Sequence, residues 1–191
     1  SAQTVRDIMQ QNGARQVTIA TTPEKRLRLW KGRKAAFAAM GKLSPDYYVQ
    51  DGVIPRAQLP YVLSEIEALS QKYNYRVANV FHAGDGNLHP LILYNNAIPG
   101  QLETVEALGG DILKLCVDAG GSISGEHGIG ADKRCYMPQM FTDADLETMQ
   151  WVRQAINTRG LANPTKLFPS PKTCGEAANA QAVPFATIER F

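Results

Sequence analysis

The stretch His82-Ala-Gly-Asp-Gly-Asn-Leu-His89 joins two apolar runs, 77–81 and 88–93, that are rich in strand-forming residues. Glycine, aspartate and asparagine between two such runs are typical of a tight turn between antiparallel strands. If 84–87 forms the loop, His82 pairs directly with His89, and their Cβ atoms lie roughly 5 Å apart on one face of the sheet. The stretch therefore predicts a β-hairpin that brings two imidazoles together.

The segments on either side of this hairpin predict the other elements of an α+β domain. Apolar residues recur at helical spacing along 60–73 and 102–119. Further helices are expected over 4–12, 23–41 and 143–159, the last capped by Thr142, and further strands over 16–20, 47–53 and 122–124. Because strands and helices do not alternate strictly, we expect an antiparallel sheet with helices on one face, in a ferredoxin-like arrangement.

Length and composition set limits on the class of protein. The 191 residues suffice for a domain with a sizeable core, which we expect over 1–174, followed by a tail at 175–191. The net charge of +2, without a basic stripe, argues against a nucleic-acid partner. No apolar run approaches the roughly 20 residues that span a membrane. Three widely spaced cysteines without a Cys-x-x-Cys pair suit a reducing cytoplasm.

All three histidines lie either in the hairpin stretch or in a second short motif, Gly125-Glu126-His127-Gly128. Two imidazoles and the carboxylate of Glu126 would bind a divalent metal and leave positions open for water or substrate. Zinc, manganese and iron all fit these ligand types. His127 would then serve as a general base beside the metal. Composition alone leaves a second interpretation open, in which these histidines are structural.

Arg33 lies on the expected helix 23–41, close in sequence to Trp30. Its guanidinium group can bind a carboxylate through two hydrogen bonds, which favours a role in holding an acidic substrate. The alternative is that Arg33 is one of several basic residues on a solvated helix face. Lys166, in the segment Asn163-Pro-Thr-Lys166, has the same two interpretations.

Taken together, these motifs resemble those of a known family. From about Val5 to Pro171, the chain is similar to the C-terminal portion of the flavin-linked 2-hydroxy-acid dehydrogenases. The motifs at 82–89 and 125–130 are the most specific, and support comes from the segments 29–37, 46–48, 51–56 and 163–166. Within this family, which includes D-lactate and D-2-hydroxyglutarate dehydrogenases, the motifs favour the glycolate oxidase branch.

The resemblance implies roles for individual residues. It makes His82, His89 and Glu126 divalent-metal ligands, and it makes His127 the base that takes the hydroxyl proton of the substrate. It also makes Arg33 a contact for the carboxylate of the substrate.

Two further pairs of residues follow from the same resemblance. Asn163 and Lys166 fall in the segment that closes over the flavin, so they are expected to bind the cofactor. Val49 and Leu91 stand where the hydroxyglutarate branch carries a lysine and an asparagine that contact substrate. This replacement argues against a dicarboxylate substrate.

The resemblance implies that the whole protein oxidises glycolate or D-lactate to the 2-oxo acid and passes a hydride to FAD. We expect this chain alone to be inactive, because FAD is held mainly by an N-terminal domain that these residues lack. The first strand that the family usually has in its substrate domain is also expected to be missing, before Val5. The expected partners are the substrate, that flavin domain and electron-accepting subunits, through which a cytoplasmic protein would associate with a membrane. Two other functions stay open: a metal-dependent hydrolase with the same ligands, and a non-catalytic module that pairs with a separate flavin protein.

Overall fold

The computed structural model describes residues 1–169, so the expected tail at 175–191 and its boundary lie outside the described residues. The chain divides into two compact units, Ser1–Ala39 and the residues from Met40 onward. The first unit contains helices α1 (Ala2–Gln11) and α2 (Pro23–Lys34), and the short helix α3 (Ala36–Met40) follows at the boundary.

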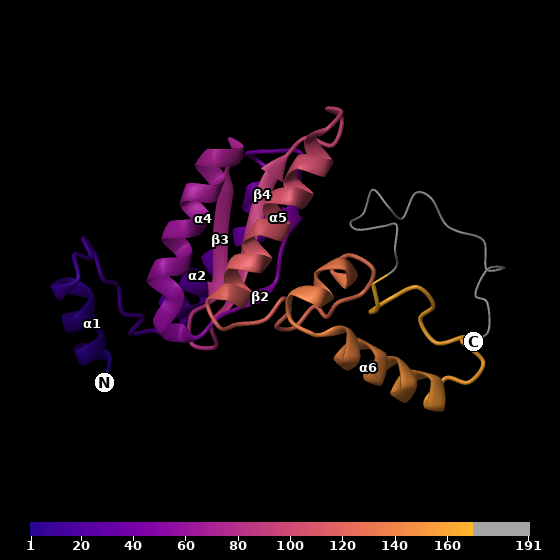
Figure 1. Cartoon of the computed structure of the whole chain (residues 1–191). Helices are drawn as coiled ribbons and strands as arrows, with labels where there is room; N and C mark the ends of the chain where they lie inside the picture. Colours follow the sequence, from indigo (N-terminus) through magenta and orange to yellow (C-terminus); the bar gives the residue numbers. More distant parts are fainter. Residues whose placement is uncertain (170–191) are drawn as a thin grey trace. The chain divides into compact units, whose positions relative to one another are not determined.

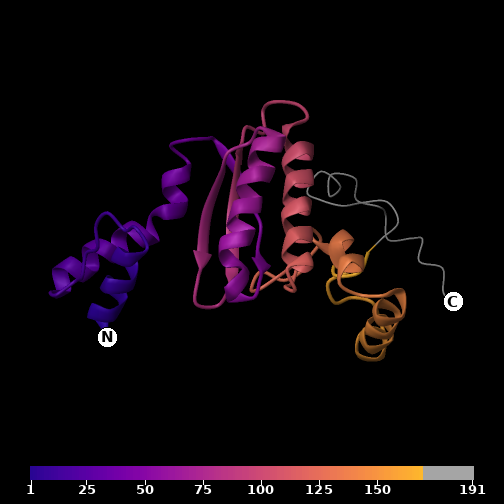
Figure 2. The same ribbon diagram turned by 60° about the vertical axis from the view of Figure 1, so that its left-hand side comes forward.

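The second unit is built around a small antiparallel sheet whose central strand is β4 (Asn87–Tyr94). Strand β3 (Val77–His82) pairs with one edge of β4, while β1 (Asp46–Val49) and β2 (Gly52–Val53) pair with the other edge, one after the other. Helices α4 (Leu59–Tyr73) and α5 (Gln101–Asp118) lie side by side on one face of this sheet (Figures 1 and 2). Short 3-10 helices span Arg56–Gln58 and Arg134–Gln139.

The order of elements confirms the α+β prediction, including its ferredoxin-like arrangement. A first strand, split into β1 and β2, is followed by α4, the β3–β4 hairpin and then α5. After α5, Ser122 forms an isolated antiparallel bridge with Val53. The predicted strand at 122–124 is therefore reduced to a single bridge, at the position where a ferredoxin-like sheet has its last strand.

Alternation along β4 separates a core face from a site face. Leu88 and Ile92 pack against Val62 and Ile66 of α4, together with apolar side chains of α5. Successive side chains of a strand point to opposite faces. His89, which lies between Leu88 and Pro90 in sequence, therefore faces away from α4 and α5. The core thus holds the strand that presents the histidine.

The predicted register of the hairpin is wrong by two residues. The turn covers 83–86 instead of 84–87, so that His82 pairs with Asn87, and His89 pairs with Val80. Gly86 takes the left-handed conformation that closes the turn, with φ of 74°, and Asn87 joins the strand because it also pairs with Val53. Since side chains alternate with period two, a shift of two residues leaves His82 and His89 on the same face.

Three other predicted elements differ from the structure. Residues 16–20 form no strand, because two apolar residues in alternation have no partner ladder among the described strands. The expected strand 47–53 is interrupted at Gln50 and Asp51, between β1 and β2. The expected helix 23–41 ends at Lys34, where the chain takes a turn at Ala35 before α3 begins.

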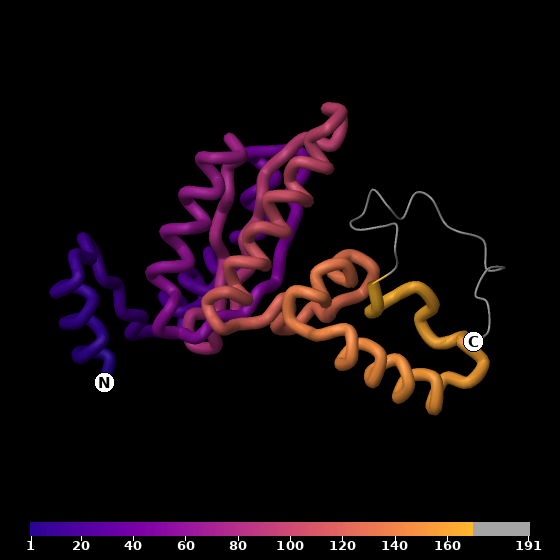
Figure 3. The backbone as a smooth tube through the Cα atoms, in the orientation of Figure 1, coloured from indigo at the N-terminus to yellow at the C-terminus, as the bar shows by residue number. Residues whose placement is uncertain are grey.

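Beyond α5, a long loop leads to helix α6 (Asp143–Ile156), as the tube in Figure 3 shows. The predicted cap at Thr142 is confirmed: its side chain accepts from the Asp145 N–H, and the Asp145 side chain accepts from the Thr142 N–H in return. Leu146 of α6 packs with Leu113, Ile123 and Met137 in a second apolar cluster. None of the helices over residues 1–169 is long and apolar enough to cross a membrane.

Candidate functional site

The side chains of His82, His89 and Glu126 meet at the end of the hairpin. The Glu126 Oε1 atom lies 2.7 Å from the Nε2 atom of His89 and 3.8 Å from that of His82. The two imidazole rings are 5.5 Å apart and nearly perpendicular, with an interplanar angle of 87°. His89 is 4% exposed, whereas His82 and Glu126 are about half exposed at 44% and 52%. The trio therefore has one buried member and an open side.

This geometry fits a small divalent cation. One ligand atom from each of the three residues lies within 4.8 Å of the others. Ligands at about 2.0–2.1 Å from a tetrahedral zinc ion are separated from each other by roughly 3.3 Å. The two distances from Glu126 to the histidines, 2.7 and 3.8 Å, lie on either side of that value. Two imidazoles and one carboxylate are also a donor set that zinc, manganese and iron accept.

His127 lies beside this trio, and its ring stacks on that of His89 with a centroid distance of 5.1 Å and an interplanar angle of 14°. Adjacent residues in an extended strand would point to opposite sides. Glu126 and His127 instead both reach His89, because they lie in an irregular loop between glycines 125 and 128.

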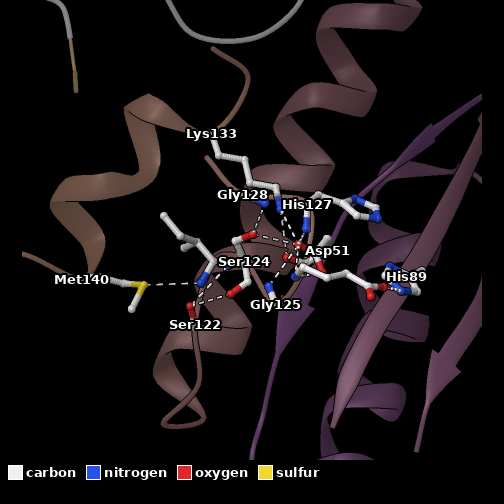
Figure 4. Close-up of polar contacts among 11 residues, drawn as sticks. Asp51, His89, Ser122, Ser124, Gly125, His127, Gly128, Lys133 and Met140 are labelled. Carbon is white, nitrogen blue, oxygen red and sulfur yellow. Dashed lines mark hydrogen bonds and ion pairs between the residues drawn. The ribbon is translucent and has the colours of Figure 1, made fainter. Parts of the chain in front are cut away.

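Asp51 holds this loop in place (Figure 4). Its Oδ2 atom accepts a hydrogen bond from the Ser124 hydroxyl at 2.8 Å and from the backbone N–H groups of Gly125, Glu126 and His127 at 3.0, 3.2 and 3.0 Å. A completely buried carboxylate thus faces consecutive N–H groups of the residues that carry the site. The interruption between β1 and β2 is what places Asp51 there.

Lys133 compensates the buried charge of Asp51. Its Nζ atom donates to the Asp51 carbonyl oxygen at 2.9 Å and lies 3.3 Å from the carboxylate. Burial alone would raise the pKa of the Asp51 carboxyl, but the His127 N–H, the Ser124 hydroxyl and Lys133 hold that pKa well below its usual range. Burial lowers the pKa of the Lys133 ammonium, against the opposing effect of Asp51.

A second trio, Asp51, His89 and His127, also brings its ligand atoms within 4.8 Å of one another. It is a poorer candidate for metal binding, because the Asp51 carboxylate already accepts hydrogen bonds from the loop and from Lys133. Moving that carboxylate onto a cation would take the acceptor away from the loop N–H groups and the charged partner away from the buried Lys133 ammonium, which is costly. The trio that contains Glu126 keeps its carboxylate available.

An open cavity of about 350 Å³ adjoins the ligand trio. Its walls come from β2, the hairpin and the loop, and the lining residues are Val53, His82, Asp85, Asn87, Gly125 and Glu126. A small organic acid fits a space of this size, at the lower end of the usual range for ligand pockets of about 300–1,000 Å³. The candidate metal ligands therefore stand at the edge of a cavity that a substrate can enter.

Comparison with known proteins identifies the family. A model of the family described as FAD linked oxidases, C-terminal domain, matches residues 1–167. The chain belongs to this family. Among its curated relatives in the FAD-linked oxidase family, glycolate oxidase subunit GlcD of Escherichia coli (strain K12) is 49% identical over 191 residues, which cover 98% of this chain and 38% of the relative.

Two more distant FAD-linked relatives agree. Glycolate oxidase subunit GlcD of Bacillus subtilis (strain 168) is 30% identical over 84% of this chain and 34% of its own length. A mitochondrial D-lactate dehydrogenase (cytochrome) of Saccharomyces cerevisiae is 30% identical over 86% of this chain and 29% of its own length. The chain thus spans between 29% and 38% of the length of these relatives, which are named as oxidase subunits or a dehydrogenase.

The remaining residues predicted from the family resemblance lie outside the ligand trio. Arg33 is an exposed residue of α2, in the first unit, and its contact with a carboxylate stays a prediction. Asn163 and Lys166 have exposed side chains, and their carbonyl oxygens accept hydrogen bonds from the Arg153 guanidinium at 2.6 and 3.0 Å. The Leu167 N–H donates to the Gly130 carbonyl oxygen at 2.8 Å, which ties this segment to the end of the second motif.

The supporting residues of the site were not predicted from the sequence. Asp51 was noticed only as part of a family motif, although a charged residue inside an apolar strand was a usable sign of a buried contact. Asn87 was taken for a turn residue, although it lies in β4 and lines the cavity. No pattern distinguished Lys133 from an ordinary surface lysine.

Proposed function

We propose that this chain is the substrate-binding domain of a flavoprotein that oxidises a small 2-hydroxy acid, such as glycolate or D-lactate, to the 2-oxo acid. The observation that carries the proposal is the meeting of His82, His89 and Glu126 beside His127 at the edge of a cavity. The family match favours this chemistry over metal-dependent hydrolysis. The names of the relatives favour glycolate or D-lactate as the substrate.

In this proposal His82, His89 and Glu126 hold a divalent cation, zinc, manganese or iron. A cation bound there supplies Lewis acidity that favours ionisation of the substrate hydroxyl. The open side of the trio admits the substrate, whereas His89 is enclosed and fixes the position of the site within the sheet. Glu126 Oε1 and His89 Nε2, which lie 2.7 Å apart, would both be ligands of such a cation.

His127 removes the proton from the hydroxyl oxygen of the substrate. Its backbone is held by Asp51 and its ring by stacking on His89, so the imidazole is oriented before substrate arrives. As the O–H bond breaks, the hydrogen at C2 leaves with its electron pair and the C2–O bond becomes a carbonyl. FAD, when bound by the whole protein, supplies the acceptor for that hydrogen and its two electrons.

The carboxylate of the substrate is assigned to Arg33, and the flavin-facing segment to Asn163 and Lys166. These assignments follow the family motifs. Val49 of β1 is directly paired with Leu91 of β4. Strand β4 also carries His89. An apolar pair offers nothing to a second carboxylate, which favours a substrate with a single carboxylate.

We also propose that the whole protein works with a flavin-binding domain and with further subunits that accept electrons, since two of the relatives are named as subunits. We place it in the cytoplasm, with membrane association through those subunits. Cell fractionation and co-purification test this part of the proposal.

The test of the site is zinc binding by the purified chain, measured by isothermal titration calorimetry. Glu126→Gln and His82→Ala, which change exposed side chains, are expected to weaken binding by more than about 100-fold, because each removes a ligand. Glu147→Gln changes an exposed carboxylate on α6 and serves as the matched control. Equal zinc affinity in all four proteins would overturn the metal site.

The test of the chemistry uses the full-length flavoprotein that carries this chain. Glycolate and D-lactate are expected to reduce its flavin, and His127→Ala is expected to lower kcat by about 10²–10⁴-fold with zinc retained. A flavin that stays oxidised with every 2-hydroxy acid would overturn the proposed activity, and normal turnover in His127→Ala would overturn the role of the base.

A further inference from the structure

Asn87 has a buried side-chain amide that takes no part in the proposed metal binding or proton transfer. Its side chain is 7% exposed, and its Oδ1 atom is enclosed without a hydrogen-bond partner. The interactions of the described residues include no hydrogen bond to its amide nitrogen either. An unpaired buried acceptor costs about 1–3 kcal/mol, and the amide nitrogen, which makes no hydrogen bond within the described residues, is left to donate to a molecule in the cavity.

The position of Asn87 points its amide toward the cavity. Asn87 is paired with His82 on β3 and lies two residues before His89 on β4, so the three side chains share one face. Its Oδ1 atom packs against Gly125, where an added Cβ would come within 2.9 Å of it. Of the two amide atoms only Oδ1 is enclosed without a partner, which leaves the amide nitrogen as the end that reaches the cavity.

The charges around the cavity explain why a neutral donor is useful there. Two of the lining side chains, Asp85 and Glu126, are carboxylates and repel an organic acid. A cation held by the trio offsets that repulsion, but an acid also needs hydrogen-bond donors for its remaining oxygen atoms. An amide N–H donates to a carboxylate oxygen and is neutral, so it does not repel the cation as a lysine or arginine side chain would.

We propose that Asn87 is a substrate-binding residue whose amide N–H donates to the carboxylate of the 2-hydroxy acid in the cavity beside His82 and Glu126. This inference rests on the proposed function and adds a contact to it. Asn87 binds the acid equally in the ground state and the transition state, because the carboxylate takes no part in bond breaking. Its loss therefore raises KM and leaves kcat nearly unchanged.

The test compares two variants at Asn87 in the full-length flavoprotein. Asn87→Ala removes the donor and is expected to raise KM for glycolate or D-lactate about tenfold or more. Asn87→Asp keeps the shape, replaces donors by a negative charge and is expected to raise KM further. In both variants kcat is expected to change less than about threefold and the zinc content to stay at the wild-type level. Asn79→Ala, at an exposed asparagine of β3, is the matched control.

The outcomes separate this inference from the function on which it rests. A wild-type protein that oxidises no 2-hydroxy acid overturns both. A wild-type protein that is active, with an Asn87→Asp variant of unchanged KM, overturns the role of Asn87 alone. A loss of zinc and of kcat in parallel with the rise in KM would show a merely structural role for Asn87 and would also overturn the inference.

Discussion

The two regions that build the site, the β3–β4 hairpin and the loop 124–133, position their side chains by different means. The hairpin carries His82 and His89 on a regular ladder, in which register alone decides the face. The loop carries Glu126 and His127 on irregular backbone, and its N–H groups find their acceptor in the buried carboxylate of Asp51. A ladder tolerates a shift of two residues, whereas the N–H groups of residues 125–127 share one acceptor and depend on that side chain.

Asp51→Ala is expected to have the largest effect on stability and on zinc binding. It removes the charged partner of the buried Lys133 ammonium and the acceptor of three part-buried backbone N–H groups. Removal of one partner of a buried ion pair is expected to lower the free energy of unfolding by about 3–5 kcal/mol, and zinc binding is expected to be lost as Glu126 moves. Chemical denaturation and zinc titration measure the two effects.

An exposed ion pair provides the control for that variant. Asp118→Ala breaks the pair between Lys114 and Asp118 on the surface of α5, where both side chains are about 60% exposed. Exposed pairs contribute about 0–1 kcal/mol, so the stability of this variant is expected to remain close to that of the wild type. If both variants lose the same stability, Asp51 does not hold the loop.

Acid titration of stability tests the same residue without removing it. The pKa of Asp51 is lower in the folded chain than its unfolded value of 3.8, so its carboxylate stabilises the fold at any pH above that value. This contribution is lost progressively as the pH falls below 3.8 toward the folded pKa. Asp51→Asn is expected to show a flatter decline in stability over this window. Superimposable pH profiles for the two proteins would contradict the assignment.

The contact between the two regions is tested by Gly125→Ala. A Cβ at this position would lie 2.6 Å from Val53 Cγ2 and 2.9 Å from Asn87 Cγ, so the loop must move away from β4. Overpacking of this kind costs about 1–3 kcal/mol, and we expect zinc affinity to fall about 10–100-fold. Gly84→Ala, with no heavy atom within 4 Å of the added Cβ, is the control and should bind zinc normally.

The smallest effect is expected at a position remote in sequence from both regions. Thr142→Ala removes the capping box of α6, and the loss of an N-cap side chain costs about 1 kcal/mol. Thermal unfolding is expected to show this loss, while zinc affinity stays at the wild-type level. A marked fall in zinc affinity would mean that α6 helps to position the loop, and the contrast between ladder and loop would need revision.

Periodic patterns of apolar residues were enough to predict several helices and strands. The helices α4 and α5 and the strands β3 and β4 were predicted within one or two residues, because apolar alternation at 2 or 3.6 residues reflects burial on one face. The three candidate ligands were also found from sequence, since histidine and glutamate in glycine-rich motifs are local features. The choice of face for His82 and His89 survived the wrong register for the same periodic reason.

The way in which Glu126 and His127 reach the hairpin depends on contacts that form in the folded chain. That placement depends on Asp51, which lies 75 residues before Glu126, and on Lys133, whose role no local pattern marks. Likewise, the amide of Asn87 is left without a partner because Gly125 packs against it, a contact between segments far apart in the chain. Such contacts form between buried polar groups once the chain is folded, and residue periodicity carries no information about them.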